Sequence, residues 1–255
     1  MKVFKYEALN ILRSKWLTIN FLAFALLTWA VGRITGDPQR TMNSVASFSV
    51  IFVPLIAILF STLYWYGAER FTHLMLTQPL PRARLYWSRL AAICLLLTTS
   101  TIIGLNLGLL VSGSWSLGSL LLDLVVAVLS CTFVAISMWF CVLSNDRMRG
   151  VGIMFGLWLY FVLVHDGLVL LLLIAAREYP LDLIGGLLGV TNPIGLARVV
   201  LLMANESALL LGHTGALVRE VLTGMKGFLI AGGFATIWMV IPSVFGARSF
   251  LRRDF

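Results

Sequence analysis

Charged side chains are scarce in this sequence. Only 12% of its 255 residues are Asp, Glu, Lys or Arg, whereas 60% are hydrophobic. A soluble domain of this length carries about 25% charged residues, which solvate its surface. The shortage excludes an ordinary soluble domain and indicates that the outside of the protein faces lipid.

Motifs for catalysis and nucleotide binding are also missing. The sequence has no Gly-x-x-x-x-Gly-Lys-Ser/Thr loop, so we expect no nucleotide site of that kind on this chain. It has neither His-Glu-x-x-His nor Gly-x-Ser-x-Gly, which weakens the case for an intramembrane hydrolase. We predict that the chain is not an enzyme, has no catalytic residue and binds no cofactor of its own.

Potential metal ligands are few and far apart. The three histidines show no ligand spacing and the three cysteines form no Cys-x-x-Cys pair; they are His73, His165, His213, Cys94, Cys131 and Cys141. Isolated thiols in apolar helices usually pack as small hydrophobes. Cys131 and Met138 lie about 10 Å apart along a helix, too far to share one ion. Core packing and a stepwise path for a soft ion are the two alternatives for them, and no metal site is predicted.

Long apolar runs dominate what is present. A helix needs about 20 mostly apolar residues to cross a bilayer, and six stretches approach that length: Trp16–Gly32, Ser44–Tyr66, Leu90–Ser112, Leu117–Leu143, Val151–Ala175 and Gly227–Gly246. The first resembles a signal-peptide core, but the patterned segment before it favours a retained helix. The sequence therefore predicts an all-α polytopic membrane protein, with residues 1–255 as a single transmembrane domain.

The formal charge of +8 is distributed unevenly along the chain. If the N-terminus is cytoplasmic, thirteen Lys and Arg residues lie in inside segments and six in outside segments. Cytoplasmic loops carry the excess of basic residues in membrane proteins. We therefore interpret the charge as an orientation signal, with both termini cytoplasmic, and predict no nucleic-acid partner.

The first fifteen residues are predicted to form an amphipathic helix. Phe4, Ala8, Ile11 and Leu12 share one helical face, and most polar residues lie off it. A basic amphipathic helix of this kind lies in the membrane interface and binds anionic lipids. A soluble tail is the alternative interpretation.

The segment Arg177–Lys226 is too long for a structureless loop in a compact domain. Its apolar runs are too short to cross the membrane. We predict two short helices, Asn192–Ala204 and Thr214–Met225, that enter or rest on the outer membrane surface.

Two carboxylates fall inside predicted spans. Asp166, next to His165, lies well into the fifth span, where an ionisable group is unfavourable unless it faces protein or water. The alternatives are an interhelical hydrogen bond and a place on a cargo or transmission path. Neighbouring helical residues point about 100° apart, so we expect His165 and Asp166 to be poorly placed to hold one ligand together. Asp123 lies in the second turn of the fourth span, where a helix N-terminus favours a carboxylate.

The densest polar stretch runs from Glu69 to Leu90. Phe71, Leu74 and Met75 recur at helical spacing and predict a short amphipathic helix from about Ala68 to Thr77.

Two prolines bound this predicted helix. Gln78 precedes Pro79, which ends the helix, and Pro81 opens the next one. The arginines that follow, Arg82, Arg84 and Arg89, are expected to extend to lipid phosphates. The alternative to a helix that binds a partner is a plain amphipathic connector between two spans.

This stretch, "GAERFTHLMLTQPLPRARLYWSRL", resembles the region after the second span of ABC-2 type permeases, the membrane subunits of one class of ABC transporters. Glu69 matches the acidic residue of that pattern, which is single here where many relatives have several. Leu74, Met75 and Leu76 match the apolar run, and Pro79 and Arg82 match its Pro-x-x-Arg. The resemblance implies a coupling helix that docks in a groove of a cytoplasmic ATPase subunit. The loop "SNDRMRG" would reach the same subunit through Asp146 and Arg147, unless it is simply a solvated loop.

The resemblance extends along the chain. Lys2–Arg13 resembles the family's elbow helix, "NPIGLAR" (Asn192–Arg198) an Asn-Pro…Arg pattern of its outer helices, and "RSFLRRDF" its basic C-terminal end. Arg40–Phe60 with "LTQPLPR" resembles the branch that helps to mature the copper–sulfur centre of nitrous oxide reductase.

What the resemblance implies is a set of partners. They are a second copy of the chain, a separate ATPase that carries ATP and Mg²⁺, a periplasmic partner and the lipids of the bacterial inner membrane. An ATP-independent channel or secondary transporter is the alternative function. It would show inverted repeats and broken helices, and neither is evident in the sequence.

Overall fold

The computed structural model describes residues 2–76, 81–144, 146–175, 191–204 and 224–253. Throughout these ranges the regular structure is helical and contains no strand, as predicted. The helices are α1 (Lys2–Leu12), α2 (Lys15–Thr35), α3 (Pro38–Gly67), α4 (Glu69–Leu76), α5 (Arg82–Val111), α6 (Gly118–Leu143), α7 (Arg147–Leu159), the π-helical turn η1 (Tyr160–Val164), α8 (His165–Ala175), α10 (Pro193–Ala204) and α12 (Gly224–Arg252).

Six of the described helical segments are long and apolar enough to cross a membrane, which confirms the predicted six spans. They are α2, α3, α5, α6, Arg147–Val169 and Leu229–Arg252. Several begin earlier than the apolar runs suggested, because polar residues cap them. The Asp37 carboxylate accepts the backbone N–H of Gln39, and Pro38 occupies the first turn of α3. The outer connection predicted over Arg33–Asn43 is therefore reduced to Gly36 and Asp37, with Gly36 in the left-handed conformation at φ 63°.

The inner connections also differ from the prediction at their edges. Pro81 is the N-terminal cap of α5, which extends eight residues before the predicted start at Leu90. Asp146 accepts the backbone N–H groups of Met148 and Arg149, so α7 begins at Arg147. Part of the predicted basic loop Ser144–Gly150 is thus the first turn of a helix.

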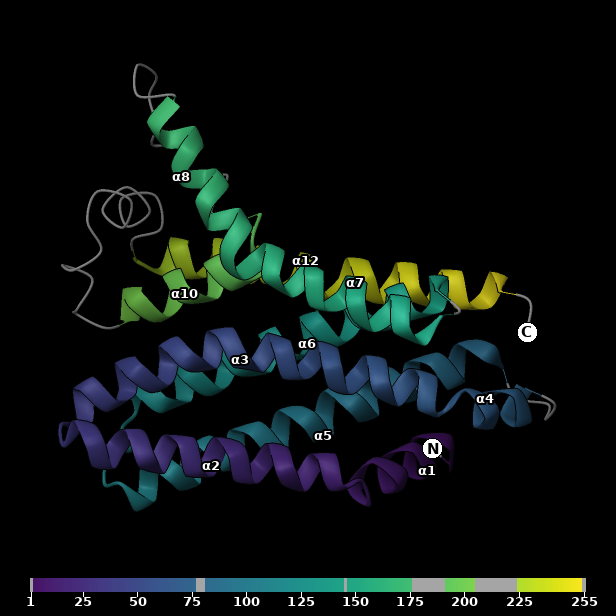
Figure 1. The fold of residues 1–255 in the computed structure, drawn as a ribbon, viewed down its shortest axis with the longest axis horizontal. Helices are drawn as coiled ribbons and strands as arrows, with labels where there is room; N and C mark the ends of the chain where they lie inside the picture. The colour runs from purple at the N-terminus through teal and green to yellow at the C-terminus, as the bar shows by residue number, and fades with distance from the viewer. Residues whose placement is uncertain (1, 77–80, 145, 176–190, 205–223, 254–255) are drawn as a thin grey trace.

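The fifth span is not a single α-helix. Five residues of π-helix, η1, join α7 to α8, and α8 leaves the bundle at an angle in Figure 1. Single π turns within α-helices are rare and are often found at functional sites.

The core lies between α3, α5 and α6, whose apolar windows are the most buried of the six spans. On α5, Gly104 and Gly108 let α2 approach closely: a methyl group on Gly104 would lie 2.7 Å from the Phe21 carbonyl oxygen, and one on Gly108 2.7 Å from that of Ala25. Small residues four apart allow such backbone contact between membrane helices.

The two ends of the bundle are distinct. The N-terminus, α4 and the C-terminal end of α12 lie at one end of the long axis, and α10 lies towards the other (Figure 1). Of the two predicted outer helices, Asn192–Ala204 is confirmed as α10. Residues 205–223 lie outside the described residues. Met225, predicted to end the second helix, belongs to α12.

Candidate functional site

The predicted coupling helix is present as α4, but its sides are not arranged as predicted. Thr72 is buried and its hydroxyl donates to the Ala68 carbonyl oxygen at 2.9 Å. Phe71 and Met75 are half-buried on the same side, whereas Leu74 is 67% exposed and Glu69 is also exposed. The sequence placed Leu74 on one stripe with Phe71 and Met75. The structure instead centres the inward face near Thr72, so Leu74 points away from the bundle.

Arg82 is the first residue of α5 and is exposed. Its Nη1 donates to the backbone carbonyl oxygen of Arg253 at 3.1 Å, so it joins the start of α5 to the end of α12. Pro79, the other residue of the predicted Pro-x-x-Arg, lies outside the described residues.

Arg89 contradicts the expectation that it extends to lipid phosphates, because only 1% of it is exposed. Its Nε and Nη2 donate to Glu7 Oε1 at 3.0 and 2.9 Å, and its Nη1 donates to Thr72 Oγ1 at 2.9 Å. The guanidinium carbon lies 5.3 Å from the ring centroid of Trp65. A buried ion pair persists when such hydrogen bonds satisfy both charges.

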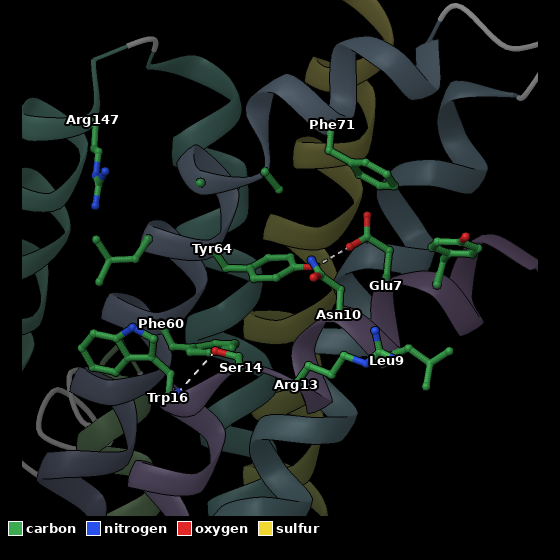
Figure 2. Close-up of a pocket in the computed structure, with 14 residues that line it drawn as sticks. Glu7, Leu9, Asn10, Arg13, Ser14, Trp16, Phe60, Tyr64, Phe71 and Arg147 are labelled. Carbon is green, nitrogen blue, oxygen red and sulfur yellow. Dashed lines mark hydrogen bonds between the residues drawn. The ribbon is translucent and has the colours of Figure 1, made fainter.

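Glu7 is the second half of this network. Only 1% of it is exposed, and Tyr64 donates from its hydroxyl to Glu7 Oε2 at 2.6 Å. Asn10 Nδ2 donates to the same hydroxyl at 3.2 Å (Figure 2). The Glu7–Arg89 network therefore connects α1, α3, α4 and α5 through side chains. Sequence reasoning missed it, although Glu7 lies three residues after Phe4 and four before Ile11, on the apolar face of α1.

The face that α1 buries is also shifted from the prediction. Val3 and Ile11 are buried, and Phe4 and Ala8 are partly buried against the core. Leu12, predicted to share this stripe, is 52% exposed. The buried charge of Glu7 thus replaces Leu12 on the packed face.

A cleft of about 910 Å³ opens beside this network. It lies between α1, the end of α3, Phe71 of α4 and Arg147 of α7, and we call it the α1–α3 cleft (Figure 2). Two of the predicted coupling residues, Phe71 and Arg147, therefore lie on the same cavity. Asp146 has a structural role, since its carboxylate caps α7 with an oxygen 2.8 Å from Met148 N.

At the other end, Asp166 is paired across helices. Its Oδ2 accepts from Arg198 Nη1 of α10 at 2.7 Å, and both side chains are about two-fifths exposed, 42% for Asp166 and 41% for Arg198. Asn192 Nδ2 lies 3.5 Å from Asp166 Oδ1 and 3.3 Å from His165 Nδ1. His165 Nε2 is 2.8 Å from Thr191 Oγ1. His165 and Asp166 therefore both contact the Asn192 side chain, and the expectation that they are poorly placed to hold one ligand together stays a prediction.

Asn192 explains the start of the "NPIGLAR" pattern. Its Nδ2 donates to the Phe161 carbonyl oxygen within η1 at 2.8 Å, and its Oδ1 accepts the Ile194 N–H at 2.9 Å. One buried amide thus caps α10 and satisfies a carbonyl in the π-helical turn. Arg198, six residues further along the chain, supplies the ion pair to Asp166.

Asp123 is held by a side chain of α5. Asn106 Nδ2 lies 2.9 Å from each Asp123 carboxylate oxygen, and Trp115 Nε1 donates to Asn106 Oδ1 at 3.0 Å. This contact accounts for Asp123 more directly than the helix N-terminus does. Across the described ranges no group of three or more His, Cys, Asp or Glu residues is arranged to hold a metal ion.

Six apolar helices and a short amphipathic helix at the end that holds both termini define a multi-pass, all-α membrane protein. No protein-family model matches the chain. It is 28% identical over 220 residues to the probable ABC transporter permease protein NosY of Stutzerimonas stutzeri, which covers 77% of this chain and 79% of that protein. It is 27% identical over 223 residues to the protein of the same name from Pseudomonas aeruginosa, with the same coverage of both chains.

These similarities confirm the resemblance to ABC transporter permeases and, among them, to NosY. Together with the six apolar helices they support a permease subunit, the membrane component of a transporter.

Proposed function

We propose that this chain is an ABC-2 type permease subunit that works as a homodimer and docks a separate cytoplasmic ATPase, which binds ATP and Mg²⁺. The observation that carries the proposal is α4. It is a short helix at the end of the bundle that holds both termini, and it directs Leu74 outward while Thr72 fixes it to Arg89. An exposed leucine on an anchored helix is suited to a hydrophobic groove on a partner.

The membrane orientation follows from the same proposal. With α4 on the cytoplasmic side, both termini are cytoplasmic and α10 lies on the periplasmic side of a bacterial inner membrane. The distribution of basic residues supports this orientation.

The proposed physiological role is to pass the work of ATP hydrolysis to export or to a periplasmic partner, in the maturation of the copper–sulfur centre of nitrous oxide reductase. The similarity to two proteins named NosY supports this role. Asp166, His165 and Asp123 are the proposed transmission or cargo-path residues, and Asp166 sits where α8 meets α10.

Docking is tested by co-purification of the tagged chain with the co-expressed ATPase. Leu74→Asp should release the ATPase because it places a charge on the docking face, while the chain still inserts and purifies. The matched control is Leu251→Asp, which places the same charge on another exposed leucine near the end of α12. If Leu74→Asp retains the ATPase as well as the control does, α4 is not the dock.

A further inference from the structure

The α1–α3 cleft has no role in the function proposed above. Figure 2 shows it bounded by side chains from α1, the start of α2, the end of α3 and Arg147 of α7. All of these segments meet at the end of the bundle that holds α4. The cleft therefore lies at the level where a membrane helix begins and lipid headgroups are found.

The charge of the cleft is positive. Arg13, just after α1, and Arg147, at the start of α7, both line it, and neither has an ion-pair partner within the described part of the chain. Glu7 also lines it, but Arg89 and Tyr64 occupy its two carboxylate oxygens. Two exposed guanidinium groups remain, which suits an anionic ligand.

The same cleft has a large apolar surface. Leu9, Phe60, Leu63 and Phe71 contribute to its walls. Trp16, at the start of α2, is 55% exposed, and Tyr6 is 66% exposed. Trp and Tyr are enriched where membrane proteins meet lipid headgroups. A small soluble anion would leave most of this apolar surface exposed to water, whereas an amphiphile covers it.

We propose that the α1–α3 cleft binds an anionic phospholipid from the leaflet at this end of the protein. Its phosphate interacts with Arg13 and Arg147, and its acyl chains lie against Phe60, Leu63 and Trp16. The site depends on these side chains alone, so it stands whether or not α4 docks an ATPase.

Native mass spectrometry of the purified, delipidated full-length chain tests the site. The chain is titrated with phosphatidylglycerol and, separately, with phosphatidylcholine of the same acyl chains. We expect tighter binding of phosphatidylglycerol. Each basic residue beside an anionic lipid contributes about fivefold to binding, so Arg13→Gln with Arg147→Gln should weaken it about 25-fold.

The matched control is Arg248→Gln with Arg252→Gln. It removes two exposed arginines at the same end of the bundle, outside the cleft, and leaves the same net charge. The control should bind phosphatidylglycerol like the unmodified chain. Equal weakening in both double variants would show diffuse attraction and overturn the site.

Two further arms fix the ligand class. Glycerol 3-phosphate supplies the headgroup chemistry without acyl chains and should not displace the lipid. Displacement at similar concentrations would instead assign the cleft to a soluble phosphate compound. Phosphatidylglycerol should also remain on the chain in complex with its ATPase. Complete loss of the lipid on complex formation would assign the cleft to the protein partner instead.

Discussion

Arg89 and Glu7 show how a charged pair is kept inside an apolar bundle. Each buried charge is strongly unfavourable alone. Arg89 donates a further hydrogen bond to Thr72, and Glu7 accepts one from Tyr64, which satisfies the atoms that the pair itself leaves. The pair joins α1 to α5, and Thr72 adds α4, so it fixes the place from which Leu74 extends.

Removing one partner of this pair should destabilise the protein severely. Arg89→Met leaves Glu7 buried and unpaired, and we expect a loss of about 3–5 kcal/mol of stability. The double variant Arg89→Met with Glu7→Met should recover much of that loss, because it removes both charges. The measurement is the unfolding midpoint of the purified chain in detergent, with both single variants beside the double. Losses that simply add would show that the two residues do not act as a pair.

Asp166 is a different kind of charge pair. Asp166 and Arg198 are each about two-fifths exposed, 42% and 41%, and side-chain hydrogen bonds between membrane helices contribute only about 0.6 kcal/mol on average. Asp166→Asn should therefore leave folding and binding of the proposed ATPase intact, and under the proposed function it should reduce the maturation of nitrous oxide reductase. The two measurements are the yield of the complex with the ATPase and the spectrum of the copper centre. Arg198→Gln tests the other residue of the ion pair in the same way. Normal maturation in the Asp166→Asn variant would show that Asp166 only links α8 to α10.

At the scale of whole helices, the contact between α2 and α5 depends on glycine. Gly108→Ala puts a methyl group 2.7 Å from the Ala25 carbonyl oxygen, so the helices must separate, which we expect to destabilise the protein by about 1–3 kcal/mol. Gly152→Ala on α7 is the control, because a methyl group there meets no atom within 4 Å. Thermal unfolding of the two variants gives the comparison. Equal midpoints would mean that the α2–α5 contact relaxes without loss.

The spans and the short helix α4 could be predicted because apolar runs and helical spacing are local properties of the sequence. Their ends were less predictable, since Asp37 and Asp146 extend α3 and α7 by capping. The surroundings of Arg89 could not be predicted from its neighbours, because its partner Glu7 lies 82 residues away. The same holds for Arg198, whose partner Asp166 is 32 residues earlier in the chain. Buried polar pairs are set by how helices pack, which periodicity does not specify.

The whole molecule has two ends that labelling can distinguish. Ser116 is exposed in the turn between α5 and α6, and Met148 is 81% exposed at the start of α7. We introduce Ser116→Cys or Met148→Cys into a chain without Cys94, Cys131 and Cys141. An impermeant maleimide added to intact cells should label the chain that carries Ser116→Cys only. Labelling only through Met148→Cys would reverse the proposed orientation.

Helix length separates α4 from the bilayer. At 1.5 Å per residue, the 30 residues of α3 and of α5 each rise about 45 Å, whereas the 21 residues of α2 rise about 32 Å. The hydrocarbon layer is only about 30 Å thick. Gly32 of α2 packs against Ser112 after α5, and only Gly36 and Asp37 separate α2 from α3, so the three helices are level at that end.

The surplus of about 13 Å, more than two helical turns, therefore lies at the opposite end, where α3 and α5 extend beyond α2 and carry α4. The ATPase proposed above, bound to α4, would contact Leu74 without touching acyl chains. The affinity of that partner for α4 should not depend on bilayer thickness. The same complex should therefore form in membranes whose lipids have different acyl-chain lengths.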